Sequence, residues 1–339
     1  MVTTRKQECD RLIQTANHAP PRAGVVFESE ISLKGFVQLA QLRPSIGNSI
    51  DHLEIRLSTQ SSPPLAILRR CLALVPNVQD LVLELPPLPS SSNFLNVHLP
   101  RLQLFNTNIH HQEVSNFLAI NPTIRYLTVG PCSKRKRSTC PLRRSDLANI
   151  IDLTSPLSCH SQVNPHKLVR LCVGPIPFAP TSTTIAFRRF GVLFSLTTLV
   201  LRFSHDDYDL LQTLFQVCPK IENLKLLELP TQSTRARREW NHHATWRANL
   251  SRLSNLEQLV LSTPRAIVDA PGDIDEERRL VLRWVTGVGA PRHPSLYLIG
   301  LHYGGDAPHA RFFSHWTREG DVWSRMRALT APLAVDDLP

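Results

Sequence analysis

The sequence predicts an α/β fold built as a solenoid of irregular repeats, in which a curved parallel sheet carries helices on its convex side. Three observations predict it. A short aliphatic pattern, Leu-x-x-Leu-x-Leu with Ile or Val allowed, recurs nine times along the 339 residues. Helix-like segments lie between several copies, and a proline ends three of these segments. Because a single strand and helix cannot bury their apolar faces alone, stacked copies would share one continuous core.

Each copy of the pattern predicts a short strand, because alternate residues of a strand point to the same face. Consecutive copies start 21 to 44 residues apart, whereas leucine-rich repeats have a period of about 20 to 29 residues. We therefore predict a leucine-rich-repeat solenoid with irregular repeats. The copies begin at Ile50, Val78, Leu99, Ile124, Leu168, Leu196, Ile221, Leu256 and Leu296.

The segments between strands repeat apolar residues at the three- and four-residue steps of a helix, as at Leu65, Leu68 and Leu72. Each of three such segments stops at a proline, which ends a helix and favours an extended approach to the next strand. These prolines are Pro76, Pro122 and Pro219.

The two ends of the solenoid are predicted to be capped. Val25 to Phe27 is predicted as a leading strand, followed by a helix from Ser32. The buried side of that helix is assigned to Leu33, Phe36, Val37, Leu39, Ala40 and Leu42. A second helix opens at Asp275, where acidic residues favour a helix N-terminus. The last aromatic residues, assigned to C-terminal helices, are Phe312, Phe313, Trp316 and Trp323.

The predicted organisation is a polar, disordered segment at 1–24, a solenoid at 25–309, and capping helices with a tail at 310–339. No apolar stretch approaches the roughly 20 residues that span a bilayer, and the polar start lacks an apolar signal core. The seven cysteines form no evident disulfide framework, which indicates a reducing compartment. We expect an intracellular protein, cytoplasmic or nuclear, that makes no membrane contact.

The net charge of +10 is concentrated in two predicted insertions, at about 130–144 and 230–249. The first is followed by a predicted helix from Ser145 to Leu153, and the second includes Arg238. A composition typical of a nuclear-import signal or of a contact with an acidic partner occurs at Lys134, Arg135, Lys136 and Arg137.

Nucleic acid is not the expected partner, because phosphate binding favours cations spread along a groove with stacking aromatics between them. Aromatic residues make up only 6% of the chain. A basic nuclear or RNA-associated protein that binds through its charged insertions is the alternative function.

Zinc is the sharpest chemical hypothesis, because Cys132, Cys140, Cys159 and His160 are suitable ligand types. The spacing argues against it, since structural zinc sites usually use pairs separated by about two to four residues. We therefore predict loop cysteines, no metal and no cofactor.

The remaining polar pairs do not predict catalysis. His110 and His111 with Glu113, and His242 with His243, are interpreted as surface polar residues. The chain contains no phosphate-binding or dinucleotide-binding glycine motif, no H-E-x-x-H and no G-x-S-x-G. We predict no catalytic residue and a protein that is not an enzyme.

The surface expected to bind a partner is the concave face of the sheet, which carries the third, fifth and seventh positions of each copy. This row begins mixed with acidic members and becomes neutral to basic from Arg101 onward. The later part therefore favours an acidic or polar ligand segment. The predicted partner-binding residues are Glu54, Arg56, Asp80, Glu84, Arg101, Tyr126, Arg170, Arg202 and Lys225.

Two segments share one order of residue types, Leu-Val-Pro-Asn-Val-Gln-Asp-Leu-Val-Leu at 74–83 and Val-Cys-Pro-Lys-Ile-Glu-Asn-Leu-Lys-Leu at 217–226. This order resembles the leucine-rich-repeat region of F-box-type proteins, particularly the divergent fungal ones, from about Val25 to the C-terminal region. In that family the repeats hold a protein substrate, and a preceding helical F-box docks on the adaptor of a cullin ubiquitin ligase.

The resemblance implies a non-catalytic protein–protein interaction scaffold that corresponds to the substrate-recognition part of a ubiquitin-ligase receptor. Its protein ligand is unknown. The 24 residues before Val25 lack the leucine-proline start of an F-box. The resemblance therefore implies adaptor docking only through a degenerate F-box.

Overall fold

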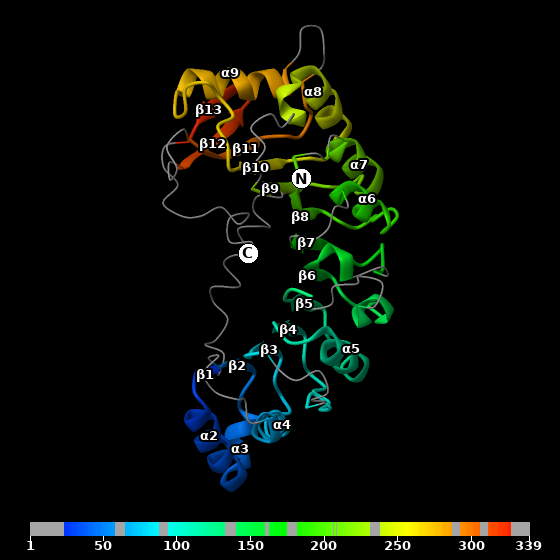
Figure 1. Ribbon diagram of the computed structural model, residues 1–339, viewed down its shortest axis with the longest axis vertical. Helices are drawn as coiled ribbons and strands as arrows, with labels where there is room; N and C mark the ends of the chain where they lie inside the picture. Colours follow the sequence, from blue (N-terminus) through cyan, green and yellow to red (C-terminus); the bar gives the residue numbers. More distant parts are fainter. Residues whose placement is uncertain are drawn as a thin grey trace, which may run out of the picture. The chain divides into compact units, whose positions relative to one another are not determined.

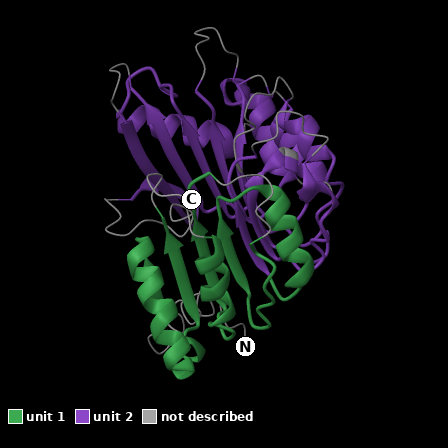
Figure 2. Ribbon diagram, turned by 60° about the horizontal axis from the view of Figure 1, so that its bottom comes forward, with its two compact units in different colours: residues 1–124 green, residues 125–339 purple. Residues whose placement is uncertain are grey.

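The computed structural model describes residues 24–57, 65–87, 94–132, 140–159, 163–174, 182–205, 207, 209–230, 238–286, 292–305 and 311–326. The chain divides into two compact units, residues 1–124 and 125–339, which Figure 2 colours separately. Both units are α/β, and in each the strands follow one another across the sheet in chain order (Figure 1). None of the described helices is long and apolar enough to cross a membrane.

The first unit has a parallel sheet, as predicted. Its described strands are β1 (Gly24–Phe27), β2 (His52–Arg56), β3 (Asp80–Glu84) and β4 (Leu104–Thr107). Its described helices are α2 (Glu30–Leu42), α3 (Pro44–Asn48), α4 (Leu65–Ala73) and α5 (His111–Ile120). Leu53, Leu81 and Phe105 are register partners in successive strands, and all three are 0% exposed. They form one row of the core.

The predicted N-terminal cap is confirmed in outline. The leading strand is β1, and α2 begins at Glu30, after Ser29, whose Oγ accepts a hydrogen bond from the Ser32 N–H at 3.2 Å. The assignment of Leu39 and Leu42 to the buried side is wrong, because these side chains are 45% and 81% exposed. An apolar stripe at i, i+3, i+4 and i+7 from Leu33 includes Phe36, Val37 and Ala40, whereas Leu39 and Leu42 lie at i+6 and i+9.

The third copy of the pattern lies three residues later than predicted. β4 pairs Leu104 with Asp80 and Phe105 with Leu81. Its interior positions are therefore Leu102, Phe105 and Thr107. Leucines occur at the first position of either register, so the spacing alone does not decide between them. The tertiary packing does, because the Phe105 ring contacts that of Phe117 in α5 at a centroid distance of 4.7 Å.

The second unit contains the longer sheet. Its described parallel strands are β5 (Tyr126–Val129), β6 (Asp152–Pro156), β7 (Arg170–Gly174), β8 (Thr198–Phe203), β9 (Asn223–Glu228), β10 (Gln258–Thr263) and β11 (Leu298–Gly304). Two antiparallel strands follow, β12 (Arg311–Glu319) and β13 (Val322–Arg325).

The helices of the second unit lie on one side of its sheet (Figure 1). The described ones are α6 (Thr183–Arg188), α7 (Leu210–Val217), α8 (His243–Arg252) and α9 (Ile274–Val285). Three short 3-10 helices are η2 (Pro141–Arg144), η3 (Leu157–Cys159) and η4 (Glu239–Asn241).

The fourth position of the pattern forms one aligned row across the second unit. The residues are in register from strand to strand, and each is 0% or 1% exposed. They are Leu127, Leu153, Leu171, Leu199, Leu224, Leu259 and Ile299. The prediction that the aliphatic triplets stack as neighbouring strands is confirmed within each unit.

Proline marks the end of three helices as predicted. α4, α5 and α7 end at Ala73, Ile120 and Val217, two or three residues before Pro76, Pro122 and Pro219. The helix predicted near Asp275 is also confirmed as α9. The carboxylate of its N-cap residue, Asp273, accepts a hydrogen bond from the Asp275 N–H at 2.8 Å.

The helix predicted from Ser145 to Leu153 is wrong. A turn leads instead into β6, where Ile150, Leu153 and Ser155 occupy the interior positions of a further repeat. A serine at the sixth position hides this copy from the aliphatic pattern. Leu147 and Ile150 at a three-residue spacing also mimic a helix.

The prediction of C-terminal helices is also wrong, since Phe312, Phe313 and Trp316 lie in β12 and Trp323 lies in β13. These strands extend the sheet beyond β11. Glu277 of α9 is 0% exposed and accepts hydrogen bonds from Tyr303 Oη of β11 at 2.5 Å and from Trp316 Nε1 of β12 at 3.3 Å, so it fastens both strands to α9.

Candidate functional site

Helices cover one face of each sheet (Figure 1). The other face carries the third, fifth and seventh positions of each copy, and we call it the open face. In β2, Leu53 and Ile55 are 0% exposed, whereas His52 and Glu54 are half-buried and Arg56 is exposed. Parallel pairing places equivalent residues of neighbouring strands about 4.8 Å apart. Open-face side chains therefore form columns across the sheet.

The open face of the first unit carries a group of charged side chains that we call the acidic cluster, formed by His52, Glu54, Arg56, Asp80 and Glu84. Arg56 Nε contacts Glu54 Oε1 and lies 3.7 Å from Glu84 Oε2. His52 Nδ1 lies 3.8 Å from Asp80 Oδ2. The cluster therefore contains three carboxylates and one guanidinium, two of the carboxylates lie beside that guanidinium, and the cluster is acidic.

Four of the predicted binding residues, Glu54, Arg56, Asp80 and Glu84, are thus brought together. Arg101 is not, because it lies in the turn before β4. The three-residue error in the register of the third copy placed it wrongly in a strand. The residues of β4 that occupy the open face are Leu104 and Asn106, both half-buried.

In the second unit, Tyr126 is 39% exposed at the start of β5. The next two strands carry an ion pair, because Asp152 and Arg170 are register partners and Arg170 Nη1 donates to Asp152 Oδ2 at 3.2 Å. Burial raises the pKa of Asp152, and the neighbouring Arg170 opposes that shift. Arg170 is therefore engaged within the chain as well as placed on the open face.

The later columns of this face are less accessible than predicted. Arg202 is half-buried, but Lys225 is only 8% exposed, and its neighbours Val200 and Val260 are 1% and 0% exposed. The pattern places Lys225 on the correct face, but its burial contradicts the expectation that it presents a charge to a partner.

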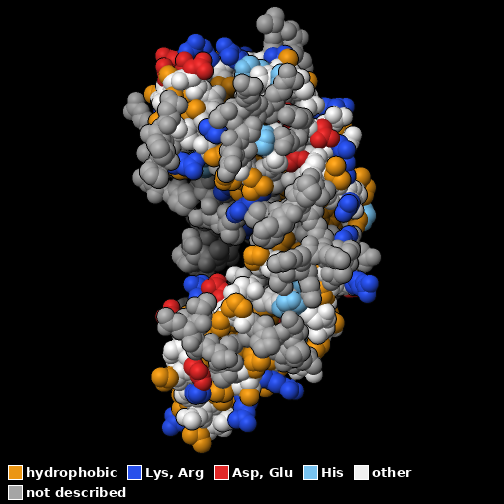
Figure 3. Space-filling view, in the orientation of Figure 1, with side chains coloured by type: hydrophobic (Ala, Val, Ile, Leu, Met, Phe, Trp, Pro, Cys, Tyr) orange, Lys and Arg blue, Asp and Glu red, His pale blue; other side chains and the backbone are white. Residues whose placement is uncertain are grey.

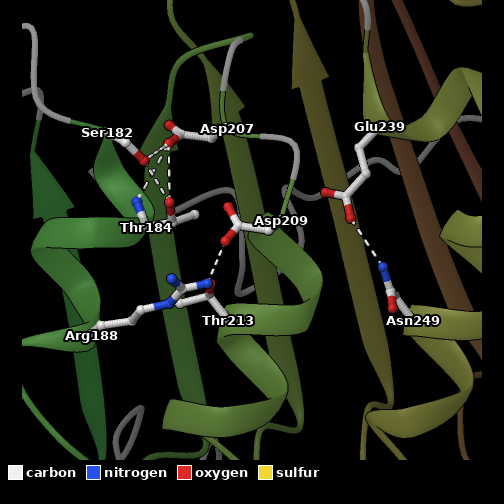
Figure 4. A network of polar contacts seen from close by, with 8 residues as sticks. All are labelled: Ser182, Thr184, Arg188, Asp207, Asp209, Thr213, Glu239 and Asn249. Carbon is white, nitrogen blue, oxygen red and sulfur yellow. Dashed lines mark hydrogen bonds and ion pairs between the residues drawn. The ribbon is translucent and has the colours of Figure 1, made fainter.

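A polar network lies on the helix side of the second unit (Figure 4). The Asp207 carboxylate, 4% exposed, accepts hydrogen bonds from Ser182 Oγ and from the Thr183 N–H at 3.3 Å. Arg188 pairs with Asp209 and donates to Thr213 Oγ1 at 2.9 Å. These contacts fasten the N-terminus of α6 to the segment before α7, which is a structural role.

Glu239 lies near this network and is 7% exposed (Figure 4). Its Oε1 accepts a hydrogen bond from Asn249 Nδ2 at 3.2 Å. Burial raises the pKa of Glu239 to about 7, and the bond from Asn249 opposes the shift. The carboxyl group is therefore held near the midpoint of its titration at neutral pH.

The second basic insertion is largely part of the packed fold. Its described residues, from Arg238 onward, form η4 and most of α8, with Trp240 and Trp246 buried. Arg238 Nε pairs with Glu228 Oε1 at 2.9 Å, and the two side chains are 11% and 0% exposed. The part of the 230–249 insertion that the structure describes is therefore partly helical. Arg238 is held by an internal carboxylate.

The basic run from Lys134 to Arg137 lies outside the described residues. Elsewhere, Lys and Arg side chains form separate small groups on the face seen in Figure 3, with acidic and hydrophobic side chains between them. The visible face therefore shows no continuous basic band among the described residues.

The loops of the second unit gather three cysteines. The Sγ atoms of Cys132, Cys140 and Cys159 all lie within 4.8 Å of one another. Cys140 and Cys159 are 3% and 1% exposed, and Cys132 is half-buried. The chain spacing did not predict this proximity. His160, the other ligand type weighed with them, lies outside the described residues.

The interpretation of the histidine pairs is correct only in part. His242 is exposed. His111 and Glu113, at 2% and 4% exposed, are buried, so their assignment to the surface is wrong. Both lie in the first turn of α5, on the side that packs inward with Val114.

The second unit also contains an open hollow of about 540 Å³. Polar side chains that line it include His243, Glu276, Arg279 and Arg283. Arg279 and Glu276 form an ion pair at 3.8 Å. The residues that line this hollow include no hydroxyl or thiol side chain.

No protein-family model matches this chain, and a search of curated proteins finds none that is significantly similar to it.

Proposed function

We propose that the protein is a non-catalytic protein-binding scaffold of the leucine-rich-repeat type, resembling the substrate-recognition part of an F-box ubiquitin-ligase receptor. One observation supports this most strongly. Successive parallel strands keep a strict register, so half-buried and exposed charged side chains of β2 and β3 stand beside one another on the open face of the first unit.

The charge on the open face supports a binding role. In most α/β proteins both faces of a parallel sheet are covered, and the strands are apolar on both sides. In the first unit, by contrast, half-buried and exposed charges stand on one face of β2 and β3. A face of this composition favours contact with water or with a polar partner.

The two units favour different ligand chemistry. The acidic cluster favours a basic segment of a partner, whereas Arg170 and Arg202 favour an acidic or polar segment. Because Asp152 already neutralises part of the Arg170 charge, Arg202 is the better position for testing the second contact. Lys225 is too buried to be a leading candidate.

The alternative function, binding of RNA through basic insertions, receives less support. Arg238 is paired with Glu228 and nearly buried, so it is not available for a phosphate. Binding that falls steeply with salt and depends on residues 134–144 would favour this alternative.

The test is quantitative affinity capture from the native cell with the full chain and four single charge reversals. Glu84→Lys and Arg202→Glu alter the open face. Arg70→Glu in α4 and Arg278→Glu in α9 alter exposed positions on the helices and serve as matched controls. We expect the open-face variants to lose specific partners that both controls retain.

Equal retention of every partner by all four variants would contradict the proposed binding face. Loss of the same partners in the helix controls would also contradict it. The presence of ubiquitin-ligase subunits among the lost or retained partners is a separate readout, since adaptor docking requires a degenerate F-box.

A further inference from the structure

We propose that Cys132, Cys140 and Cys159 bind one structural Zn²⁺ ion through their thiolates. The site lies within the second unit, in the loops that follow β5 and β6. It is distinct from the open face, and the proposal does not depend on the protein-binding function.

The parallel pairing of β5 with β6 explains how the ligands meet. Tyr126 pairs with Asp152 and Thr128 with Thr154, so both strands leave the sheet at the same edge. Cys132 follows the end of β5 by three residues, and Cys159 follows the end of β6 by three residues. Continued past the strands, this register aligns Cys132 with Ser158, the residue before Cys159, so the two thiols come close despite their separation in the chain.

Cys140 joins them from a third segment. It is the residue before η2, and η2 contacts η3, the short helix that ends at Cys159. The three ligands thus come from three chain segments held by backbone structure. Their positions do not depend on the closely spaced ligand pairs of common zinc motifs.

The geometry is close to that of a metal site. With Zn–S bonds of about 2.3 Å, two sulfurs of a tetrahedral site lie about 3.8 Å apart. The three Sγ atoms, all within 4.8 Å of one another, would need to move by about 1 Å or less to match it. Three cysteines with one nitrogen or oxygen ligand make a common structural site, so one further donor would complete the tetrahedron.

The chemistry favours a soft divalent cation over an empty thiol cluster. Zinc binds thiolates, so coordination releases the thiol protons to solvent, and the metal offsets the cost of burying the negative sulfurs. Any one disulfide would use two of these thiols and leave the third beside it. A single zinc ion uses all three.

Zinc at this position would tie together both ends of the segment between Cys132 and Cys140. That segment contains Lys134, Arg135, Lys136 and Arg137. Closing a loop at its base reduces the entropy of the unfolded chain. The metal would therefore stabilise the folded state.

The experiment measures zinc in the full chain, expressed with zinc and purified without chelator. We expect about one zinc per chain, and sulfur with nitrogen or oxygen in a ratio of about 3 to 1 at the zinc X-ray absorption edge. The double variant Cys140→Ser with Cys159→Ser should bind zinc more than about tenfold more weakly, because even the loss of a residue that only supports a ligand costs about that much. Cys172→Ser in β7 is the matched control, because Cys172 is also buried but belongs to a strand.

A cobalt titration of the chelator-treated wild-type chain keeps the test valid if the double variant does not fold. Thiolate-to-cobalt charge-transfer absorption that saturates at one equivalent would support the site. A wild-type chain that binds no zinc would overturn the proposal, and so would zinc with only oxygen and nitrogen ligands. Equal loss of zinc in Cys172→Ser, or a disulfide among the three cysteines of the protein as purified, would also overturn it.

Discussion

Glu239 offers a direct test of the packing between η4, α7 and α8. The carboxyl group is almost fully buried, and burial raises its pKa to about 7. Asn249 donates to it from α8, while Asp209, close to the start of α7, adds a like charge that contributes to the shift. Replacing Glu239 with Gln keeps an acceptor for Asn249 and removes the titration.

The direction of the pH effect follows from the pKa in the two states. Because the folded pKa is raised from 4.5 to about 7, the folded state holds a proton that the unfolded state releases. The contribution of this group to stability is fully present below about pH 4.5, and it is lost as the pH rises toward 7. A difference of about 2.5 pKa units corresponds to about 3 kcal/mol.

The assay is urea unfolding of the wild type and Glu239→Gln between about pH 5 and pH 8 at constant ionic strength. We expect Glu239→Gln to gain stability relative to the wild type across this range, by up to about 3 kcal/mol. Glu28→Gln, at an exposed position, controls for the loss of one carboxylate. A stability difference that stays constant with pH, or that falls as pH rises, would refute the proposed burial of the charge.

Three further changes test the core and its buried polar groups by chemical denaturation. Leu199→Ala should lower the free energy of unfolding by about 2 to 5 kcal/mol, because it leaves a cavity in a fully buried row. Val192→Ala, at a 39% exposed position, should lower it far less. Equal losses in the two variants would contradict the burial of this row. Arg238→Met should lower the free energy of unfolding by about 3 kcal/mol or more, because it leaves Glu228 buried without its cation. An unchanged free energy of unfolding would show that the ion pair does not form. Tyr303→Phe should lower the free energy of unfolding by about 1 to 3 kcal/mol, because Glu277 loses a hydrogen-bond donor. Tyr297→Phe, at a 38% exposed position, should lower it less. The reverse order would contradict the contact between Tyr303 and Glu277.

Local patterns predicted the repeat well where the residue types were unambiguous. Leu53, Leu171 and Leu224 each lie at the fourth position of an aliphatic triplet, and each occupies the expected row. Pro76 and Pro219 followed helices as expected, because proline acts on its own neighbourhood in the chain.

The errors occur where two local patterns compete. Leu99 and Leu102 both fit the first position of a copy, and only the packing of Phe105 selects the second register. In β6, Ser155 replaces an aliphatic residue at a buried position. In β12, the aromatic spacing suggests a helix, but pairing with β11 makes a strand.

The cysteines show that local patterns in the sequence also fail to predict a site formed by residues far apart in the chain. Ligand spacing along the chain argued against zinc, because Cys132, Cys140 and Cys159 do not form short chelating pairs. The spacing that matters is set by the register of β5 with β6, which brings Cys132 close to Cys159 where the two strands leave the sheet. A site assembled across paired strands leaves no short motif in the sequence.

The sequence by itself determined the repeating unit and the face of each strand that is buried, because hydrophobic period and proline geometry act over a few residues. Only the tertiary structure decided which positions on the open face are accessible, as at Lys225, and which thiols meet. Those properties depend on the alignment of distant strands, and the free energy that selects this alignment comes from packing between residues far apart in the chain.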